Sequence, residues 1–385
     1  MPPTPYTTNY FNQKGDTNLD TDFNLNQFEQ NLFIKAEITK TPISGAIELL
    51  PLCNMDCKMC YIKLTKTQME KQGQILSADK FLDFAKQLRE MGTLFILLTG
   101  GEPLLYPEFK KLYKELKKMG FVIVINTNAT LIDENWAEFF SNDLPRRLNI
   151  TLYGASDETY KALCNNPRGF TQVMNAVKLL KKNNIPVKFN ITITPDNIHD
   201  YEKILQIAEN LQIPVQLAHY MFPDCRCGLE KNSHENRFSP REAAEVFVKR
   251  SKTEKAPYFE DFANNYLNKI APKDSPEPLP AFGCRSSVCG FWINWKGELS
   301  PCGIINKPSI SIVDNTVDAA WKYLQIEIPK LKKSSKCSNC DKYNVCRPCA
   351  AMAYAETGKF DKTPKYLCEM TDYTIEEIKK ALDKN

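Results

Sequence analysis

The sequence predicts an α/β protein, a partial (β/α)6 barrel at residues 45–220 followed by a smaller cysteine-rich module at 284–370. Three observations support this fold class. Between residue 45 and about 220, short apolar segments alternate with amphipathic segments, as parallel strands alternate with crossover helices. The alternation ends before a proline-rich stretch at 271–280, which is typical of a stiff linker. Eight cysteines then follow between residues 284 and 368.

The barrel is predicted from six strands and the helices between them. The predicted strands are 46–52, 94–99, 122–126, 148–153, 187–194 and 215–219. The predicted helices are 78–91, 108–119, 134–140, 170–182 and 201–211. In the first helix Phe81, Leu82, Ala85 and Leu88 recur at helical spacing behind Ser77, a good N-cap residue. Six strands are too few to close an eight-stranded barrel, so we expect an open, TIM-like barrel.

The remaining segments are predicted as an extension, a bridge and a closing helix. Residues 1–44 are a polar extension, and we expect either a lid or a disordered segment. Residues 221–283 are a helical bridge, amphipathic near 241–250, that ends in the proline-rich linker. Within the module, Lys296-Gly297 after Trp292–Trp295 indicates a short hairpin. Residues 371–385 are the C-terminal helix.

Composition excludes several function classes. The chain has 50 Lys and Arg against 46 Asp and Glu, a formal net charge of +4, so we expect neither a nucleic-acid partner nor an anionic membrane partner. The sequence shows no signal peptide and no long apolar run, which predicts a cytoplasmic protein. Its 14 cysteines would stay reduced in that compartment, so we expect them to bind metal or iron–sulfur clusters.

Three cysteines, Cys53, Cys57 and Cys60, follow the first predicted strand, and Gly100-Gly101-Glu102-Pro103 follows the second. Ligands bind at the carboxyl ends of strands in parallel α/β folds, so we expect both segments at one face. A four-iron cluster normally takes four thiolates, and three thiolates leave one iron open to another ligand. A zinc site with three cysteines and an open position is the alternative.

The spacing Cys-x3-Cys-x2-Cys and the Gly-Gly-Glu-Pro segment resemble the radical S-adenosylmethionine (SAM) superfamily. This resemblance implies a [4Fe-4S] cluster on Cys53, Cys57 and Cys60 whose open iron chelates SAM. Reductive cleavage of SAM would then give a 5′-deoxyadenosyl radical that abstracts hydrogen. In the family the Gly-Gly-Glu-Pro segment holds the methionyl amino group. The family usually has an aromatic residue at position 59, where this chain has Met59, and Tyr61 is a substitute for the adenine contact.

Four further positions resemble SAM contacts of the family less specifically. Asn126 and Thr151 end the third and fourth predicted strands, and Asn190 lies in the fifth. Arg168 is suited to pair with the methionyl carboxylate in bidentate fashion. Ordinary hydrogen bonding at strand ends and turns is the alternative for all four residues.

The second cysteine group resembles the SPASM extension of peptide-modifying radical SAM enzymes. By that resemblance, one auxiliary [4Fe-4S] cluster is assigned to Cys284, Cys289, Cys302 and Cys349, and a second to Cys337, Cys340, Cys346 and Cys368. One spacing departs from the family pattern, because two residues separate Cys346 from Cys349 where the family usually has three. A pair of structural zinc sites is the alternative.

The resemblance implies an oxidoreductase that modifies a peptide, as in the maturation of ribosomally made peptides (RiPPs). It would form a thioether or carbon–carbon crosslink, with flavodoxin or ferredoxin as reductant. An anaerobic sulfatase maturase is less favoured, because that branch has an acidic residue after the cysteine matching Cys302, and here Gly303 follows. A non-catalytic iron–sulfur or zinc protein is the other alternative. We expect Cys164 and His219 to be structural and Cys225 and Cys227 to be incidental.

Overall fold

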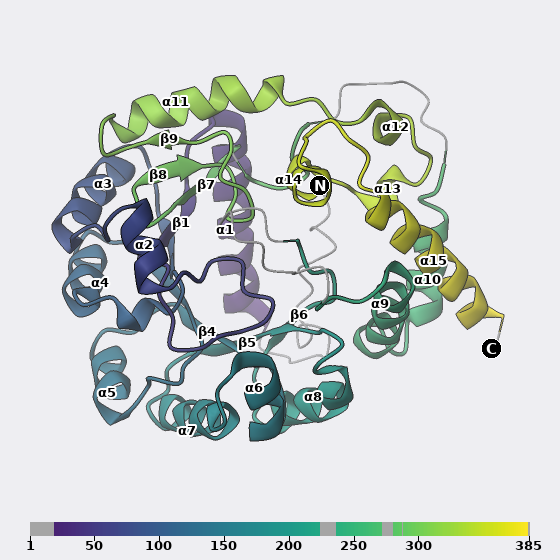
Figure 1. Ribbon diagram of the computed structural model, residues 1–385, viewed down its shortest axis with the longest axis horizontal. Helices are drawn as coiled ribbons and strands as arrows, with labels where there is room; N and C mark the ends of the chain where they lie inside the picture. Colours follow the sequence, from purple (N-terminus) through teal and green to yellow (C-terminus); the bar gives the residue numbers. More distant parts are fainter. Residues whose placement is uncertain (1–18, 224–235, 272–279, 287, 384–385) are drawn as a thin grey trace.

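The computed structural model describes residues 19–223, 236–271, 280–286 and 288–383 (Figure 1). Cys225, Cys227 and most of the predicted linker lie outside the described residues. Within the described part of the chain, no helix is long and apolar enough to cross a membrane.

One sheet of nine strands organises the molecule, in the order β6-β5-β4-β3-β2-β1-β7-β8-β9. Strands β1 to β6 pair as parallel neighbours, which confirms the predicted open (β/α)6 barrel. Their bounds are β1 Ser44–Glu48, β2 Phe95–Thr99, β3 Val122–Thr127, β4 Arg147–Thr151, β5 Val187–Thr192 and β6 Val215–Ala218. Each predicted strand is present, and the largest disagreement is at the end of β1, where the chain leaves the sheet before the three-cysteine loop.

The cysteine-rich region contributes the other strands. The predicted hairpin is formed by β7 (Gly290–Ile293) and β8 (Glu298–Ser300), which pair antiparallel, and β9 (Ile310–Ser311) follows. Strand β7 also pairs in parallel with β1, so the barrel sheet continues into the cysteine-rich region. Gly45 lies under the Phe291 ring, where an added Cβ would stand 2.1 Å from ring carbon. A glycine is therefore required at this strand contact.

Helices cover the outer face of the barrel in an arc from α3 to α8 (Figure 1). Their bounds are α3 Ala78–Glu90, α4 Phe109–Lys118, α5 Glu134–Asn142, α6 Asp157–Cys164, α7 Gly169–Lys182 and α8 Tyr201–Asn210. The predicted Ser77 cap is present, with the Ser77 side chain accepting from the Lys80 amide. Helix α6 was not predicted, and it places Cys164 beside the three-cysteine loop.

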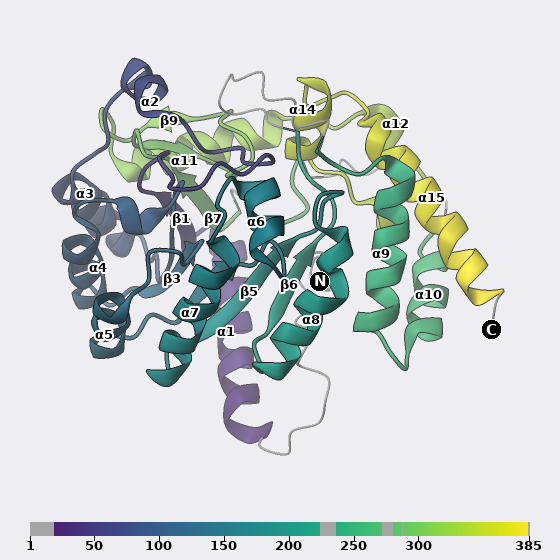
Figure 2. The same ribbon diagram turned by 60° about the horizontal axis from the view of Figure 1, so that its bottom comes forward.

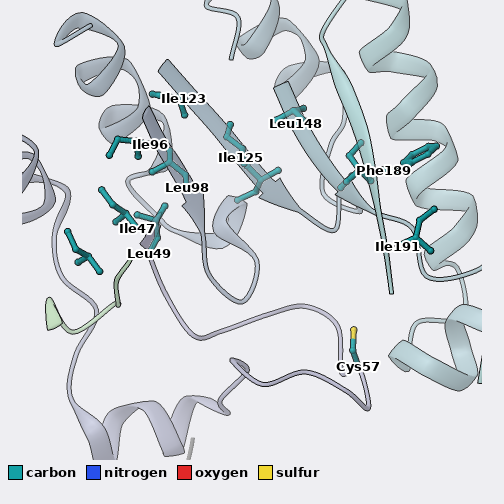
Figure 3. Close-up of a cluster of buried hydrophobic side chains, with 14 of the residues drawn as sticks. Ile47, Leu49, Cys57, Ile96, Leu98, Ile123, Ile125, Leu148, Phe189 and Ile191 are labelled. Carbon is teal, nitrogen blue, oxygen red and sulfur yellow. The ribbon is translucent and has the colours of Figure 1, made fainter. Parts of the chain in front are cut away.

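The two faces of the barrel strands differ in chemistry. Ile125, Leu148 and Phe189 point toward the helices and are fully buried (Figure 3). Alternate residues therefore face the barrel interior, and among them are Asn149 and Lys188, which are neighbours in the register of β4 and β5. The interior is polar, as expected for a binding site and not for a packed core.

The N-terminal segment forms a helix, α1 (Leu19–Thr39), where we had expected a lid or disorder. It packs beneath the amino ends of the strands, with the Phe33 ring stacked 5.3 Å from that of Phe95. Glu29 pairs with Arg146 at 2.6 Å just before β4. Phe33 and Ala36 pack inward whereas Ile34 and Ile38 are exposed, so the apolar residues of this helix do not form one face.

The C-terminal half adds a second helical group that lies on the side opposite α3 to α5 in both Figures 1 and 2. Its members are α9 Pro240–Glu254, α10 Phe259–Leu267, α12 Ser335–Ser338, α13 Tyr343–Cys346, α14 Ala350–Thr357 and α15 Lys365–Leu382. Helix α11 (Val317–Glu327) packs on α3, and the short α2 (Lys66–Gln72) follows the three-cysteine loop. The predicted C-terminal helix is present as α15 and begins earlier than expected.

Candidate active site

The three-cysteine loop follows β1 at the carboxyl ends of the strands. Its backbone is held by the end of α6, where the Asp56 and Lys58 amides donate to the carbonyls of Cys164 (2.9 Å) and Leu163 (3.0 Å). Lys58 also pairs with Asp196 at 3.1 Å. The loop is thus tied to the far side of the barrel, and its position depends on helices that come much later in the chain.

The three thiols lie close enough for their charges to interact. The pKa of Cys53 is raised to about 12, mainly by burial, with smaller contributions from the charges of Glu102, Cys57 and Cys60. The Met55 amide points at the Cys53 sulfur (3.4 Å) and opposes the rise. The Cys60 sulfur accepts a hydrogen bond from the Lys63 amide at 3.3 Å. Amide donors aimed at sulfur are suited to thiolates that carry negative charge.

Two side chains contact Cys57: Cys164, which we expected to be structural, and Tyr153, which the sequence did not single out. A hydrogen bond with Cys164, followed by burial, raises the pKa of the Cys57 thiol well above its usual value. The Tyr153 hydroxyl also hydrogen-bonds to Cys57, and its interaction lowers that pKa. The charges of Cys57, Cys60 and Cys53 all act on Tyr153, which places its ring among the three thiols. The sequence does not predict these contacts, because they arise only when the chain folds and brings β4 and α6 next to the loop.

The Gly-Gly-Glu-Pro segment lies directly against the chain that leads into the loop. The Gly101 amide donates to Leu50 O (2.7 Å) and the Glu102 amide to Leu52 O (2.9 Å). An added Cβ on Gly101 would stand 2.2 Å from Leu52 O. The glycine is therefore required by backbone packing, a reason different from the close ligand approach that we expected.

Glu102 is fully buried, and its carboxylate organises the strand ends. It accepts hydrogen bonds from the Leu104 amide (3.1 Å), the Thr127 hydroxyl (2.8 Å) and the Asn128 amide (2.8 Å). Burial raises the pKa of Glu102 to about 7, although these donors oppose the rise. A nearby ammonium group would favour the charged form.

Asn128 is a further site residue that the sequence did not identify. Its side-chain amide donates to the Cys53 sulfur at 3.6 Å and to Asn54 Oδ1 at 2.9 Å. Together with Glu102 it links the ends of β2 and β3 to the three-cysteine loop. The contact arises because parallel strands end at one edge.

The predicted SAM contacts fall into three environments. Met59 is buried and Tyr61 half-buried in the loop. Asn126, Thr151 and Asn190 lie on the interior face of the strands, where Asn126 accepts from Asn149 (2.8 Å) and Thr151 stands beside Asn190 in the register. Arg168 is exposed at the start of α7, with its charge beside Asp157. Its role as a carboxylate partner stays a prediction.

One interior atom stands out. Asn190 Oδ1 is buried and has no hydrogen-bond partner among the described residues. A buried acceptor without a partner costs free energy, and a bound ligand with a hydroxyl group would satisfy it.

The first auxiliary set, Cys284, Cys289, Cys302 and Cys349, is brought together in space. Burial raises the pKa of Cys302 to about 12, and the charges of Cys349 and Cys284 add to the effect. Burial likewise raises the pKa of Cys289 to about 11, with a small addition from Cys284. These charge interactions connect Cys284 with each of the other three cysteines, and the assignment of the four to one cluster stays a prediction.

The second auxiliary set, Cys337, Cys340, Cys346 and Cys368, lines a cavity of about 140 Å³ between α12, α13 and α15. Burial raises the pKa of Cys346 to about 12, and the charges of Cys368, Cys337 and Cys340 contribute. The departure in spacing after Cys346 does not prevent Cys346 and Cys349 from joining different sets. Arg347 adopts a left-handed backbone (φ 48°) between them and turns the chain.

Among the described residues, no group of three or more His, Cys, Asp or Glu side chains is arranged around a single-ion position. A four-iron cluster is larger than one ion, so its ligands stand farther apart. Three features of the site fit such clusters: an all-cysteine donor set, amides aimed at sulfur, and a cavity lined by four thiols.

Comparison with known proteins identifies the barrel. Residues 47–208 match the model of the radical SAM superfamily. These residues form a domain that is similar to that family. The domain includes the three-cysteine loop, the Gly-Gly-Glu-Pro segment and strands β2 to β5, whereas both auxiliary sets lie beyond it.

Relatives and solved structures extend the likeness over most of the chain. The AdoMet-dependent heme synthase of Methanosarcina barkeri is 23% identical over 347 residues, which cover 86% of this chain and 97% of that protein. Streptococcus suis SuiB bound to its precursor peptide SuiA has a TM-score of 0.65 at 15% identity, covering 93% of this chain and 84% of SuiB. The structure of anSMEcpe with bound AdoMet has a TM-score of 0.61 at 19% identity, covering 89% and 100% of the two chains. At these identities the solved structures show a shared fold around the radical SAM domain.

Proposed function

We propose that this protein is a radical SAM/SPASM enzyme that holds three [4Fe-4S] clusters and oxidatively modifies a peptide. One observation carries the proposal. Three thiols, a buried carboxylate and a Gly-Gly-Glu backbone meet at the carboxyl ends of the radical SAM barrel. A scaffold or electron-transfer protein would need the cysteines but has no need of the Glu102 arrangement beside them.

Each part of the site has a role in this proposal. Cys53, Cys57 and Cys60 hold the cluster, which leaves one iron open for SAM. When bound, the cluster and SAM supply a 5′-deoxyadenosyl radical that abstracts a hydrogen atom from the substrate. Glu102 fixes the strand ends through its three hydrogen bonds and favours a cationic amino group nearby. Asn190 Oδ1 accepts a hydrogen bond from a ribose hydroxyl.

Tyr153 and Asn128 orient the loop and stabilise negative charge on sulfur, since both donate hydrogen bonds to thiols. Met59 and Tyr61 provide the adenine contact. The two auxiliary sets each supply four thiolates, so neither leaves an iron open, and we assign them to electron transfer. Reduced flavodoxin or ferredoxin supplies the electron that starts the reaction, and the protein works in the cytoplasm.

A peptide substrate is supported by the fold shared with SuiB, which was solved with its precursor peptide. The product would be a thioether or a carbon–carbon crosslink in a ribosomally made peptide. Formylglycine formation, as in sulfatase maturation, is less favoured. The acidic residue of that branch would have to replace Gly303, where an added Cβ would stand 2.6 Å from the Trp292 ring.

A second candidate is the activity named for the sequence relatives. The Methanosarcina barkeri heme synthase aligns over 97% of its own length and 86% of this chain, so the likeness extends beyond the barrel residues that match the family model. The two candidates share the chemistry at Cys53, Cys57 and Cys60 and differ only in the substrate.

The shared chemistry is tested by anaerobic reconstitution, reduction with dithionite and addition of SAM. We expect 5′-deoxyadenosine and an iron content of about twelve per chain. Cys57→Ala should abolish 5′-deoxyadenosine and leave about eight irons, whereas Cys340→Ala should lose iron but retain cleavage. A protein that carries only zinc after anaerobic purification would overturn the proposal.

The substrate is tested with the peptide encoded by the small open reading frame nearest the gene. Crosslinking predicts a product that has lost two hydrogens and contains a new bond in tandem mass spectra. Formation of the heme absorption band from a porphyrin precursor, with no change in the peptide, would instead favour the second candidate.

A further inference from the structure

Positive charge is concentrated around the second auxiliary set. Residues 330–365 contain nine Lys or Arg and three Asp or Glu, a net charge of +6, whereas the whole chain carries only +4. Glu356, one of the three acids, is buried against Arg237 and offsets no charge at the surface. The rest of the protein is therefore slightly acidic, and this segment is strongly basic.

We call five exposed lysines of this segment the basic patch: Lys332, Lys336, Lys359, Lys362 and Lys365. The exposed Asp361 lies among them in the chain. Within the described part of the chain, none of the five forms an ion pair. Lysines of like charge repel one another, so the patch lowers stability and gains nothing from pairing. A binding role accounts for its presence.

The patch is joined to the second auxiliary set. Lys336 lines the same cavity as the four cysteines of that set, and its charge acts on Cys368. Thr363, next to Lys362 in the chain, hydrogen-bonds to Cys337. The cavity therefore lies beside the basic patch, on the side opposite α3 to α5 (Figures 1 and 2).

A contact connects this surface with the first auxiliary set. Lys333 donates to the Tyr343 hydroxyl at 2.6 Å, and the charges of Cys349 and Cys337, one from each set, act on the Tyr343 ring. The two sets of thiols thus share a neighbour. An electron that arrives at the patch has a short route inward.

We propose that the basic patch docks a small acidic electron carrier of the flavodoxin or ferredoxin class, and that electrons pass between this carrier and the second auxiliary set. The inference rests on the proposed function. In each transfer the carrier gains or loses one electron, the cluster changes by one electron in the opposite sense, and no bond forms or breaks. Complementary charge accelerates such encounters and makes them sensitive to salt.

A patch that served an acidic leader peptide would be expected at the opening of the barrel. The observed patch borders the second auxiliary cavity, so the electron carrier is the favoured partner. Poly-glutamate provides the competing test, because it has the charge of an acidic peptide and no redox centre.

The experiment measures binding of a fluorescently labelled flavodoxin to the reconstituted full-length holoenzyme by anisotropy. We expect Lys332→Glu with Lys359→Glu, two patch lysines that do not line the cavity, to weaken binding at least about tenfold, and rising salt to weaken binding of the unmodified protein. The control is Lys178→Glu with Lys182→Glu on the exposed face of α7, which should bind like the unmodified protein. Equal weakening in both variants, or none in the first, would overturn the proposal, as would tight binding of poly-glutamate but not of flavodoxin.

A second readout separates this inference from the proposed function. Dithionite is small and needs no docking surface, so dithionite-driven formation of 5′-deoxyadenosine should be the same in the patch variant and the unmodified protein. Flavodoxin-driven formation should fall with the binding. Absence of 5′-deoxyadenosine from the unmodified protein with dithionite would refute the proposed function, and the anisotropy result would still decide the docking surface.

Discussion

At the scale of single residues, the site depends on side chains that stand behind the three thiols. Tyr153 and Cys164 contact Cys57, and Asn128 contacts Cys53. Hydrogen bonds to cysteine sulfur stabilise the more negative, reduced state of an iron–sulfur cluster and so raise its reduction potential. These residues therefore have consequences that can be measured without any substrate.

Tyr153→Phe removes the hydroxyl that hydrogen-bonds to Cys57 and keeps the ring. We predict a shift of the midpoint potential of the SAM-binding cluster to a more negative value, and slower flavodoxin-driven SAM cleavage as a result. Redox titration followed by EPR measures the shift. Tyr106→Phe, which removes a hydroxyl bonded to Leu76 O, is the control and should leave the potential unchanged. An unshifted Tyr153→Phe potential would contradict the assigned contact.

His219 is buried, in accord with the structural role expected from the sequence. Burial and the neighbouring Arg250, whose Nη1 lies 3.5 Å from Nδ1, lower the pKa of His219 to about 3. Phe247 covers the ring, and Glu254 pairs with Arg250 at 2.7 Å. In the unfolded chain the pKa of histidine is about 6.5, so the unfolded state binds the extra proton between these two values.

We therefore predict that His219 lowers the free energy of unfolding as pH falls from about 6.5 toward 3, by at most about 1.4 kcal/mol per pH unit. His219→Gln should flatten this part of the pH dependence in thermal unfolding. His199→Gln, at an exposed histidine, is the control. Identical slopes in His219→Gln and the unmodified protein would show that the imidazole is not held neutral.

At the scale of elements, backbone packing places the loops. The Gly-Gly-Glu-Pro segment forms hydrogen bonds with the chain between β1 and Cys53, and the packing around Gly101 leaves no room for a side chain there.

A second connection joins the barrel to the cysteine-rich region. Arg237 forms a bidentate pair with Glu356 of α14, at 2.7 and 3.1 Å, and Tyr220, after β6, donates to the same carboxylate.

Gly101→Ala should displace the segment from Leu52 O, because the added Cβ would stand only 2.2 Å away. We predict a loss of about 1–3 kcal/mol in stability and weaker SAM binding. Calorimetry of SAM binding and thermal unfolding measure the two effects. Gly283→Ala, where no atom lies within 4 Å of the added Cβ, is the matched control. Normal SAM affinity in Gly101→Ala would show that the segment tolerates the shift.

Glu356→Gln leaves Arg237 buried without a counter-charge. We predict a loss of about 3–5 kcal/mol, since both side chains are less than 10% exposed. Denaturant unfolding measures this loss in the free energy of unfolding. Glu376→Gln breaks the pair with Arg241, in which both side chains are about half exposed, and should cost less than about 1 kcal/mol. Equal effects in the two variants would contradict the structural importance of the buried pair.

The sequence predicts the barrel elements well because their signals are local. Periodic apolar residues behind a cap define α3, and short apolar runs define β2 to β6. It does not predict that β7 pairs with β1, since that contact joins residues about 250 positions apart in a parallel register that no local pattern encodes. Helix α1 was missed because its apolar residues lie on both its packed and its exposed side, as Phe33 and Ile34 do, and therefore give no clear helical periodicity.

The same distinction holds for the site. Cys53, Cys57, Cys60 and Glu102 were predicted from spacing and from their positions after strands. Tyr153 and Asn128 were not singled out, and Cys164 was expected only as a structural residue, because the relevance of all three depends on which strand and helix lie next to the loop. Gly101 was expected to allow close approach of a ligand, but it is required because its backbone packs against Leu52. The motif alone does not show this tertiary contact.

At the scale of the whole molecule, one continuous sheet links the radical SAM barrel to the cysteine-rich region. The proposed SAM site lies at the carboxyl ends of the barrel strands, and the two proposed auxiliary sets lie in the C-terminal half of the chain. The basic patch lies on the surface by the second auxiliary set. This arrangement suits a path for electrons between the surface and the barrel.

The central claim is that three thiolates hold a four-iron cluster whose open iron binds SAM. EPR spectroscopy of the reduced, oxygen-free holoenzyme with and without SAM tests it most directly. We predict that SAM changes a signal that is present in the unmodified protein and missing from Cys57→Ala. A spectrum that SAM leaves unaltered, or an equal change in Cys57→Ala, would contradict the claim.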